Sequence, residues 1–319
     1  MNKIAVLTSG GDAPGMNPAI RAVVRQSIYK NINVYGIRRG FYGLLNGEIE
    51  PLEVGSVAGI IHRGGTMLRT ARCPEFLTAK GQTEGIKFLS QEKIEGLVVI
   101  GGDGSFKGAR VLDKAGFSTI GIPATIDNDI PFTDFCIGYD TALNTVTDAI
   151  NKLRDTTASH ERVSVVEVMG RSTGHIALMA GLAGGAESIM VPEVPFDLGE
   201  ISNRLLRGLQ RGKLHSIIVV AEGAGSAIQI GQELEKLTGM EIRTTILGHL
   251  QRGGTPSASD RILASRLGAK AVNLLEEGQK GKAVGYFKGE AIATPYQEIL
   301  NGKKQFSRED YELAGILAN

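Results

Sequence analysis

The stretch EGLVVIGGDGSFKG, residues 95–108, contains an apolar run, a glycine-rich turn and the start of a helical pattern in direct succession. The run LVVI is continuous and β-branched, which is typical of a strand buried on both faces. A strand that enters a helix through a short turn is the unit from which parallel sheets are built. The stretch therefore predicts a doubly wound α/β fold, whose ligands bind beyond the carboxyl ends of the strands.

The same pattern recurs along the chain. Eight further β-branched runs are expected to form strands: KIAVLTSGG, NVYGIRRG, STIGIPATID, RVSVVEVMGR, ESIMVPE, HSIIVVAEGAG, RTTILGHLQRGG and AVGYFKGE. Helical periodicity is found between them, in residues 14–30, 75–92, 138–160, 197–212, 228–239 and 257–278. Because strands and helices alternate, we expect mainly parallel sheets that are covered by helices on both faces.

Length and composition indicate a soluble globular protein. The 319 residues are enough for two domains, and length alone places a boundary near residue 138. Hydrophobic residues make up 42% of the chain and charged residues 22%, as in ordinary globular proteins. The net charge of +1 argues against a nucleic-acid binder.

The sequence also predicts where the protein works. No apolar run approaches the roughly 20 residues of a membrane span, and the first residues lead into a strand without a signal-peptide pattern. The two cysteines, Cys73 and Cys136, have no metal-ligand spacing and are too few for a disulfide framework. We therefore expect a cytoplasmic protein with no membrane partner and two structural cysteines.

Two glycine-rich turns are candidate phosphate-binding sites. SGGD, residues 9–12, and GGDGS, residues 101–105, each follow a strand and open a helix, so backbone N–H groups and a helix N-terminus can approach an anion. Gly102, Gly104 and Gly108 form G-x-G-x-x-x-G, one residue from the dinucleotide fingerprint. The chain has neither a P-loop motif nor an H-R-D catalytic loop, which excludes P-loop and protein-kinase machinery.

Acidic residues stand next to these turns. GIPATIDNDIPFTD, residues 121–134, carries Asp127 and Asp129 just beyond an apolar run. In an extended chain both side chains would face one side, whereas a solvated Asp/Asn turn before Pro131 is the alternative. Together with Asp103, they would place three carboxylates near bound phosphates, an arrangement that calls for Mg²⁺.

Basic residues gather near the same strand ends. Each alone is more often a solvated surface residue, but a guanidinium binds phosphate through two parallel hydrogen bonds, and phosphoryl transfer needs such cations. The candidates are Arg69, Arg72, Arg162, Arg171, Arg243 and Arg252, with His249 beside the last of them.

A hydrolase is an alternative of another class. Gly170, Ser172 and Gly174 form G-x-S-x-G after a strand, and Asp197 and His249 follow in the order of a catalytic triad. The chain has no HGGG-type oxyanion motif, and this alternative leaves both phosphate turns unexplained.

Nine motifs together resemble the bacterial ATP-dependent 6-phosphofructokinases, over residues 1 to about 285. They are TSGGDAPGMNPAIR, TARCPEF, GGDGSFKGA, ATIDNDI, GYDTALNTV, RDTTASHER, VEVMGR, AEGAGS and LGHLQRGG, in this order. The resemblance implies phosphoryl transfer from Mg-ATP to the 1-hydroxyl of fructose 6-phosphate, which gives fructose 1,6-bisphosphate and ADP in glycolysis. It also implies a homotetramer of two doubly wound domains, with the active site in the cleft between them. Residues 1–138 plus about 251–301 would bind nucleotide, and 139–250 plus about 302–319 the sugar phosphate.

The resemblance assigns roles by motif. Asp127 would be the general base, Arg171 and Thr125 would stabilise the transferred phosphoryl, and Asp103 and Asp129 would hold Mg²⁺. The nucleotide site would comprise Gly11, Arg72, Cys73, Gly102, Asp103, Gly104, Ser105 and Gly108. The substrate site would comprise Thr125, Asp127, Asp129, Met169, Gly170, Arg171, Glu222, His249 and Arg252, with Arg162 and Arg243 from a neighbouring subunit.

The phosphoryl donor is expected to be ATP. Gly104 matches the ATP form of the family, whereas the pyrophosphate form carries a carboxylate there. Ala124 departs from the usual glycine but is not the lysine of the pyrophosphate form, and Leu77 and Gln82 replace arginines near the nucleotide. A pyrophosphate-dependent enzyme and a non-catalytic phosphometabolite sensor remain alternatives. The GGDG turn is also similar to that of NAD and lipid kinases, which do not explain the LGHLQRGG arginines.

A second anion site is implied away from the chemistry. Arg21 and Arg25 are four residues apart, so they share one helical face, although ordinary surface charge is the alternative. With Arg154, Gly185, Glu187, Arg211 and Lys213 they match the family's effector site, where ADP activates or phosphoenolpyruvate inhibits. Glu187 would there be a Mg²⁺ ligand beside a diphosphate.

Overall fold

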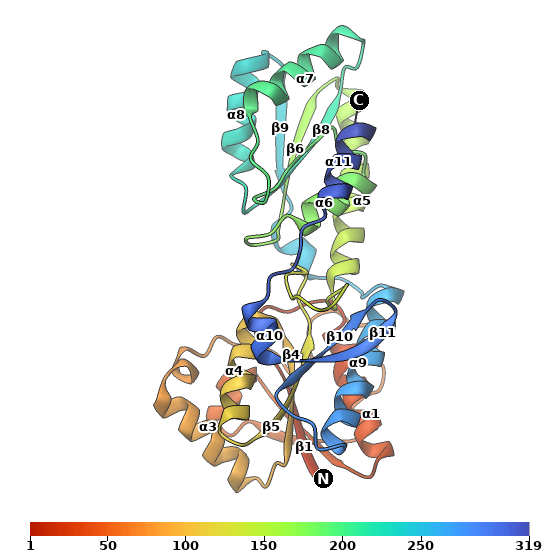
Figure 1. Ribbon diagram of the computed structural model, residues 1–319. Coiled ribbons are helices and arrows are strands. Elements are labelled where there is room, and N and C mark those ends of the chain that lie inside the picture. Colours follow the sequence, from red (N-terminus) through yellow and green to blue (C-terminus); the bar gives the residue numbers. More distant parts are fainter. Residues whose placement is uncertain (319) are drawn as a thin grey trace. The chain divides into compact units, whose positions relative to one another are not determined.

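The computed structural model describes residues 1–318 (Figure 1). The chain forms two compact units, unit 1 with Met1–Thr141 and Arg252–Lys304, and unit 2 with Ala142–Gln251 and the residues from Gln305 on. It therefore passes from one unit to the other three times. The sequence predicts boundaries after residues 138, about 250 and about 301, and the two units divide after Thr141, Gln251 and Lys304.

Unit 1 is built on a seven-stranded sheet of order β11-β10-β5-β4-β1-β2-β3. Its strands are β1 (Lys3–Thr8), β2 (Asn33–Ile37), β3 (Ile49–Leu52), β4 (Gly96–Gly101), β5 (Ser118–Pro123), β10 (Lys282–Phe287) and β11 (Glu290–Pro295). The five central strands are parallel, and the edge strands β3 and β11 pair antiparallel with their neighbours. Both β4 and β5 are almost wholly buried, as their apolar sequences require.

Helices cover both faces of this sheet (Figure 1). On one face α1 (Met16–Tyr29) packs against α9 (Ala258–Glu276), and on the other α4 (Asp103–Lys114) contacts α3 (Ala79–Gln91) and α10 (Tyr296–Asn301). The remaining elements are α2 (Gly40–Leu45) and the 3₁₀ turns Gly55–Val57 and Pro74–Leu77. The core between β4, β1 and the α4 face includes Leu97, Val99 and Phe106, all fully buried.

Unit 2 has a four-stranded parallel sheet of order β7-β8-β6-β9. Its strands are β6 (Val163–Val168), β7 (Ser188–Met190), β8 (Ser216–Ala221) and β9 (Ile242–Ile246). Its helices are α5 (Tyr139–Ser159), which begins in unit 1, α6 (His175–Ala183), α7 (Leu198–Gln210), α8 (Ala227–Thr238) and α11 (Arg308–Leu317), with a 3₁₀ turn at Gly248–Arg252. Within it α7 packs on α8, and α6 packs on α11.

The predicted fold class, doubly wound and mainly parallel α/β, is confirmed in both units. All nine runs expected to be strands contain one. The helix expected from residue 75 begins instead at Ala79, because the Thr78 hydroxyl caps it by accepting the N–H of Gly81. The prediction of its start is therefore wrong by one turn.

A buried carboxylate holds the start of α5, where the chain first leaves unit 1. Asp260, in the first turn of α9, accepts the N–H groups of Gly138 and Thr141, both at 2.8 Å, and the Thr141 hydroxyl at 2.5 Å. Burial raises the pKa of Asp260. Three donors on one carboxylate fix the beginning of α5 relative to α9.

Within residues 1–318, no helix combines the length and the apolar character that crossing a bilayer would require.

Candidate active site

The two glycine turns lie side by side at the carboxyl ends of the adjacent strands β1 and β4. The N–H of Ser9 donates to the carbonyl of Ile100 at 2.9 Å. A Cβ on Gly101 would lie 2.4 Å from the carbonyl oxygen of Ser9, so only glycine permits this approach. Above Gly104, by contrast, a Cβ would meet nothing within 4 Å. The second turn is thus closely packed against the first turn at Gly101, and the space next to Gly104 is open.

The second turn leads directly into α4. Gly102 is the residue before the helix and supplies no side-chain cap. Its carbonyl already accepts the N–H of Ser105 at 3.0 Å, so the N–H groups of Asp103 and Gly104 are the ones available to an anion. The Ser105 hydroxyl is buried and has no hydrogen-bond partner within residues 1–318. Asp103 forms an exposed ion pair with Lys107 at 2.7 Å. Exposed ion pairs contribute little to stability, so the Asp103 carboxylate can exchange Lys107 for a metal cation.

Aromatic packing explains another glycine of the motif. A Cβ on Gly108 would lie 2.5 Å from the Phe41 ring, which stacks on Phe76 with ring centroids 4.4 Å apart. Gly108 thus has a packing reason to be glycine, and its contact with nucleotide stays a prediction. Nearby, Arg72 is exposed, and burial raises the pKa of the half-buried Cys73 thiol.

The segment that carries Asp127 and Asp129 follows β5 and lies against the second turn. The N–H of Ala124 donates to the carbonyl of Gly101 at 3.0 Å, and Thr125 lies next to Gly102. The Thr125 hydroxyl accepts the N–H of Asp127 at 3.2 Å. Asp127 is only 2% exposed, so the solvated turn considered from the sequence is excluded.

The expectation of an extended D-N-D segment is wrong. Asn128 has a φ of 50°, in the left-handed region that asparagine tolerates better than most residues. Its side chain donates to the carbonyl of Asp134 at 3.2 Å and accepts the N–H of Cys136 at 2.9 Å. The alternation of side chains in a strand therefore does not apply, and Asn128 closes the segment into a loop. Sequence reasoning missed this role.

The carboxylates of unit 1 fit magnesium better than a transition metal. Within residues 1–318 no three His, Cys, Asp or Glu side chains are grouped to hold a metal ion. Mg²⁺ needs only one or two carboxylates, because water and substrate phosphates supply its other oxygens. Asp103 and Asp129 follow the neighbouring strands β4 and β5 and offer such oxygens.

A second group of predicted residues lies within unit 2, around the end of β6. Glu222 accepts the N–H groups of Gly170 at 3.1 Å and Arg171 at 2.7 Å, which holds a turn in which Arg171 has a φ of 55°. Gln251, fully buried, accepts the N–H of Met169 at 3.1 Å and donates to Gly248 at 3.0 Å. Gln251 thus joins this turn to the segment that carries His249, a link that the sequence did not reveal.

The remaining basic residues fall into two places. In unit 2, Arg162 and Arg243 both pair with Glu241, at 3.0 and 2.5 Å. Arg252 belongs to unit 1, where its guanidinium donates to the carbonyl of Asp12 at 3.2 Å and covers Gly11. A Cβ on Gly11 would lie 2.5 Å from that guanidinium, so glycine makes room for it.

The side chains do not support the hydrolase alternative. Asp197 is the N-cap of α7, where its carboxylate accepts the N–H groups of Gly199 at 2.6 Å and Glu200 at 3.2 Å. It is therefore engaged as a helix cap rather than as the partner of a histidine. The left-handed residue of the turn is Arg171 and not Ser172, unlike a strained nucleophile elbow.

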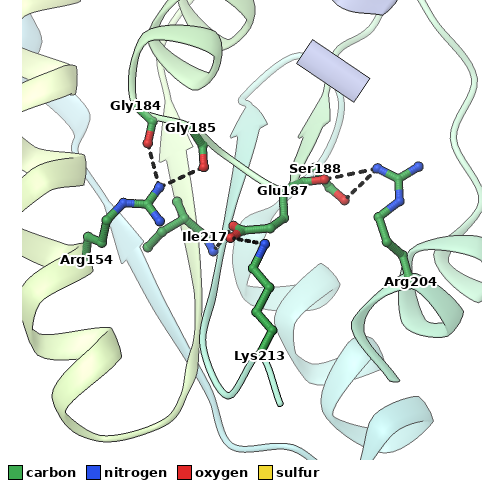
Figure 2. Close-up of polar contacts among 8 residues, drawn as sticks. All are labelled: Arg154, Gly184, Gly185, Glu187, Ser188, Arg204, Lys213 and Ile217. Atoms are coloured by element: carbon green, nitrogen blue, oxygen red, sulfur yellow. Dashed lines mark hydrogen bonds and ion pairs between the residues drawn. The ribbon is translucent and has the colours of Figure 1, made fainter. Parts of the chain in front are cut away.

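The predicted effector residues of unit 2 gather around residues 184–188 (Figure 2). Arg154 donates to the carbonyls of Gly184 at 2.5 Å and Gly185 at 2.8 Å. Glu187 is buried, pairs with Lys213 at 2.9 Å and accepts the N–H of Ile217 at 2.5 Å. Its carboxylate is thus already satisfied, and it would have to release Lys213 to bind a cation.

Three predicted effector residues lie outside this group. Arg21 and Arg25 are on α1 of unit 1, and burial, with a smaller contribution from Arg25, lowers the pKa of Arg21. Arg211 is exposed at the end of α7 in unit 2.

Fold and site together define a class of protein. Glycine turns, a helix N-terminus and carboxylates at the carboxyl ends of parallel strands are typical of α/β phosphotransferases. The family model for phosphofructokinase matches residues 3–275. The chain belongs to the phosphofructokinase family.

Relatives match over the full length. An ATP-dependent 6-phosphofructokinase of Bacillus pumilus (strain SAFR-032) is 60% identical over 318 residues, and one of Bacillus subtilis (strain 168) is 59% identical, each with 100% of both chains covered. The structure of phosphofructokinase from Saccharomyces cerevisiae aligns with a TM-score of 0.89 and 36% identity, over 94% of this chain and 45% of that one. A pyrophosphate-dependent phosphofructokinase from Nitrosospira multiformis aligns with a TM-score of 0.88 over 99% and 91% of the chains, but at 20% identity it supports the fold alone.

The contacts of Glu222 yield a test of how the unit 2 turn is held. Replacement by glutamine keeps an oxygen that can accept the N–H groups of Gly170 and Arg171, whereas leucine leaves both without an acceptor. We expect Glu222→Leu to lower kcat/KM for fructose 6-phosphate about 100-fold, as a misplaced site does. Glu222→Gln should lose less than about tenfold, the worth of one hydrogen bond. Equal losses of kcat/KM in the two variants would show that the contacts with the N–H groups of Gly170 and Arg171 do not determine the activity.

Proposed function

We propose that the chain is an ATP-dependent 6-phosphofructokinase, which transfers the terminal phosphoryl of ATP to the 1-hydroxyl of fructose 6-phosphate in glycolysis. The observation that carries the proposal is the contact between the Gly101–Gly102 turn and the segment from Ala124 to Asp129, which puts an anion site beside a buried carboxylate. The full-length identity of about 60% to enzymes of that name supports it.

The proposed chemistry divides among the residues to which the family motifs assign roles. The N-terminus of α4 and the open side of Gly104 would receive the phosphates of ATP. Asp127 would take the proton from the attacking hydroxyl, with Thr125 beside it, while Arg171 stabilises the charge on the transferred group. Asp103 and Asp129 would hold Mg²⁺, which neutralises phosphate charge when bound.

The sugar phosphate would be bound mainly by unit 2. The turn at Met169–Arg171, Glu222 and His249 would offer hydrogen-bonding groups, and Arg252 would add a cation. His249 is exposed, which fits a ligand contact better than a core histidine. We further propose that Arg162 and Arg243 reach the site of a neighbouring subunit in a homotetramer, and Glu241 supports this by keeping the two guanidinium groups together.

Features of the proposed nucleotide site favour ATP as the phosphoryl donor. The space above Gly104 leaves room for a nucleotide, whereas an acidic side chain at this position would fill that space. Ala124 is 1% exposed, so its additional methyl is covered by protein. Leu77 is 82% exposed, and Gln82 contacts the carbonyl of Phe76 at 3.3 Å, so neither is engaged with a distant element. The free cysteines, Cys73 and Cys136, fit work in the reducing cytoplasm.

One assay separates the candidate functions. Purified protein with Mg²⁺ and fructose 6-phosphate should form the bisphosphate with ATP, and with pyrophosphate the rate should be at least about 100-fold lower, because the site is proposed to recognise the nucleotide as well. Faster turnover with pyrophosphate would contradict the choice of donor. Cleavage of a chromogenic ester by the parent, lost in Ser172→Ala, would support the hydrolase alternative. Binding of both ligands with no turnover would indicate a sensor.

We propose, in addition, that the residues around Glu187, together with Arg21, Arg25 and Arg211, bind anionic effectors such as ADP and phosphoenolpyruvate between subunits. Lys213 and Arg154 bring positive charge to the same loop, and Arg204 fixes that loop by donating to the carbonyl of Glu187 at 3.0 Å (Figure 2). A carboxylate inside a basic group favours a ligand that brings a cation and disfavours one that does not.

Saturation with fructose 6-phosphate tests this effector site. In the parent, phosphoenolpyruvate should raise the half-saturating concentration about fivefold or more, a typical coupling between sites. In Arg25→Ala/Arg211→Ala this shift should disappear. The control is Arg207→Ala, because Arg207 is also exposed and lies on α7, the helix that ends at Arg211; this variant should keep the shift. Inhibition that persists in the double variant would place the effector elsewhere.

A further inference from the structure

Lys304 is the last residue of unit 1, and its side chain reaches the segment that carries Asp127 and Asp129. Its ammonium donates to the side-chain oxygen of Asn128 at 3.2 Å, to the carbonyl of Asp134 at 2.8 Å and to the carbonyl of Thr133. Lys304 belongs to none of the sequence motifs and has no part in the proposed chemistry.

These three contacts use all the hydrogen-bond donors of the Lys304 ammonium. An ammonium has three N–H donors, and all three acceptors lie within residues 128–134. The side chain is half-buried, and burial lowers the pKa of Lys304. An apolar side chain of similar length would avoid the cost of burying a charge. The hydrogen bonds to one loop are what offset that cost.

The acceptors join the two halves of the loop. Residues 133 and 134 are also fixed to β10, because Asp134 donates its N–H to the carbonyl of Tyr286 at 2.7 Å and Thr133 accepts the N–H of Tyr286 at 3.0 Å. Asn128 stands between the two carboxylates in a left-handed conformation. Lys304 therefore connects the residue between the carboxylates to the part of the loop that is anchored on the sheet.

We propose that Lys304 is a positioning residue for Asp127 and Asp129, which sets the rate of phosphoryl transfer rather than the affinity for either substrate. The proposal rests on the proposed function, in which Asp127 is the base. Because Asn128 lies between both carboxylates, a change in its backbone angles would move both of them. Displacement of a reacting group by about 1 Å can cost about 100-fold in rate.

The test compares Lys304→Met with Lys303→Met, the neighbouring exposed lysine, as the matched control. Hydrogen exchange of a peptide that covers residues 126–136 reports on the loop itself, and kinetics with ATP and fructose 6-phosphate report on its consequence. In Lys304→Met we expect faster exchange of this peptide and a kcat at least about tenfold lower, with both KM values within about threefold of the parent. Lys303→Met should match the parent, and Lys304→Arg should recover part of the loss, since it keeps charge and donors.

A second variant guards against failure to fold. Asn128→Gly removes the acceptor of Lys304, together with the bonds to Asp134 and Cys136, but permits the left-handed backbone, so it should show exchange at least as fast and a lower kcat. Unchanged exchange in a folded Lys304→Met would overturn the proposal, and so would faster exchange with an unchanged kcat. An inactive parent would instead overturn the proposed function, and the exchange data would still decide whether Lys304 holds the loop.

Discussion

One backbone hydrogen bond, from the N–H of Ala124 to the carbonyl of Gly101, joins the two elements on which the site depends. It continues the parallel pairing of β4 with β5 by one step beyond the last paired residues, Gly101 and Pro123. Because both strands point the same way, the loop after β5 must emerge beside the helix that follows β4. The N-terminus of α4 and the carboxylates of the loop are thereby brought together by sheet geometry alone.

This arrangement places unlike groups in one small region. The helix N-terminus favours anions, and Asp127 is buried in the loop that is hydrogen-bonded to the turn before this helix. The loop is held by the polar contacts of Thr125, Asn128 and Lys304 as well as by the burial of its apolar residues Ile126 and Ile130. Such contacts are directional, which suits a segment that must hold a base in one place.

Much of the fold could be predicted because the central strands are continuous apolar runs. Strands such as GLVVIG in β4 and SIIVVA in β8 are buried along their whole length, and glycine marks where they end. The edge strands β3 and β11 were not predicted, because each is only partly buried and its sequence lacks a continuous apolar run. The short helix α10 likewise offered too few turns for a period to be recognised.

The site was predictable in its motifs and not in its supports. Asp103 and Asp127 stand beside recognisable turns, so strand order alone brings them close. Asn128 resembled an ordinary turn residue, and its bond to Cys136 is invisible in the sequence. Lys304 comes from a polar segment about 170 residues farther along the chain, with no pattern to connect it to the loop. Gln251 and Glu241 were missed for the same reason, since their partners are set by the folded chain.

The proposed reaction depends most on Asp127, which would remove the proton from the sugar hydroxyl. The most direct measurement is turnover of fructose 6-phosphate and ATP by Asp127→Asn, together with the binding of each ligand by calorimetry. We expect a kcat lower by about 10² to 10⁴-fold, as for loss of a positioned base, with both ligands still bound. A kcat close to that of the parent, with binding intact, would contradict it.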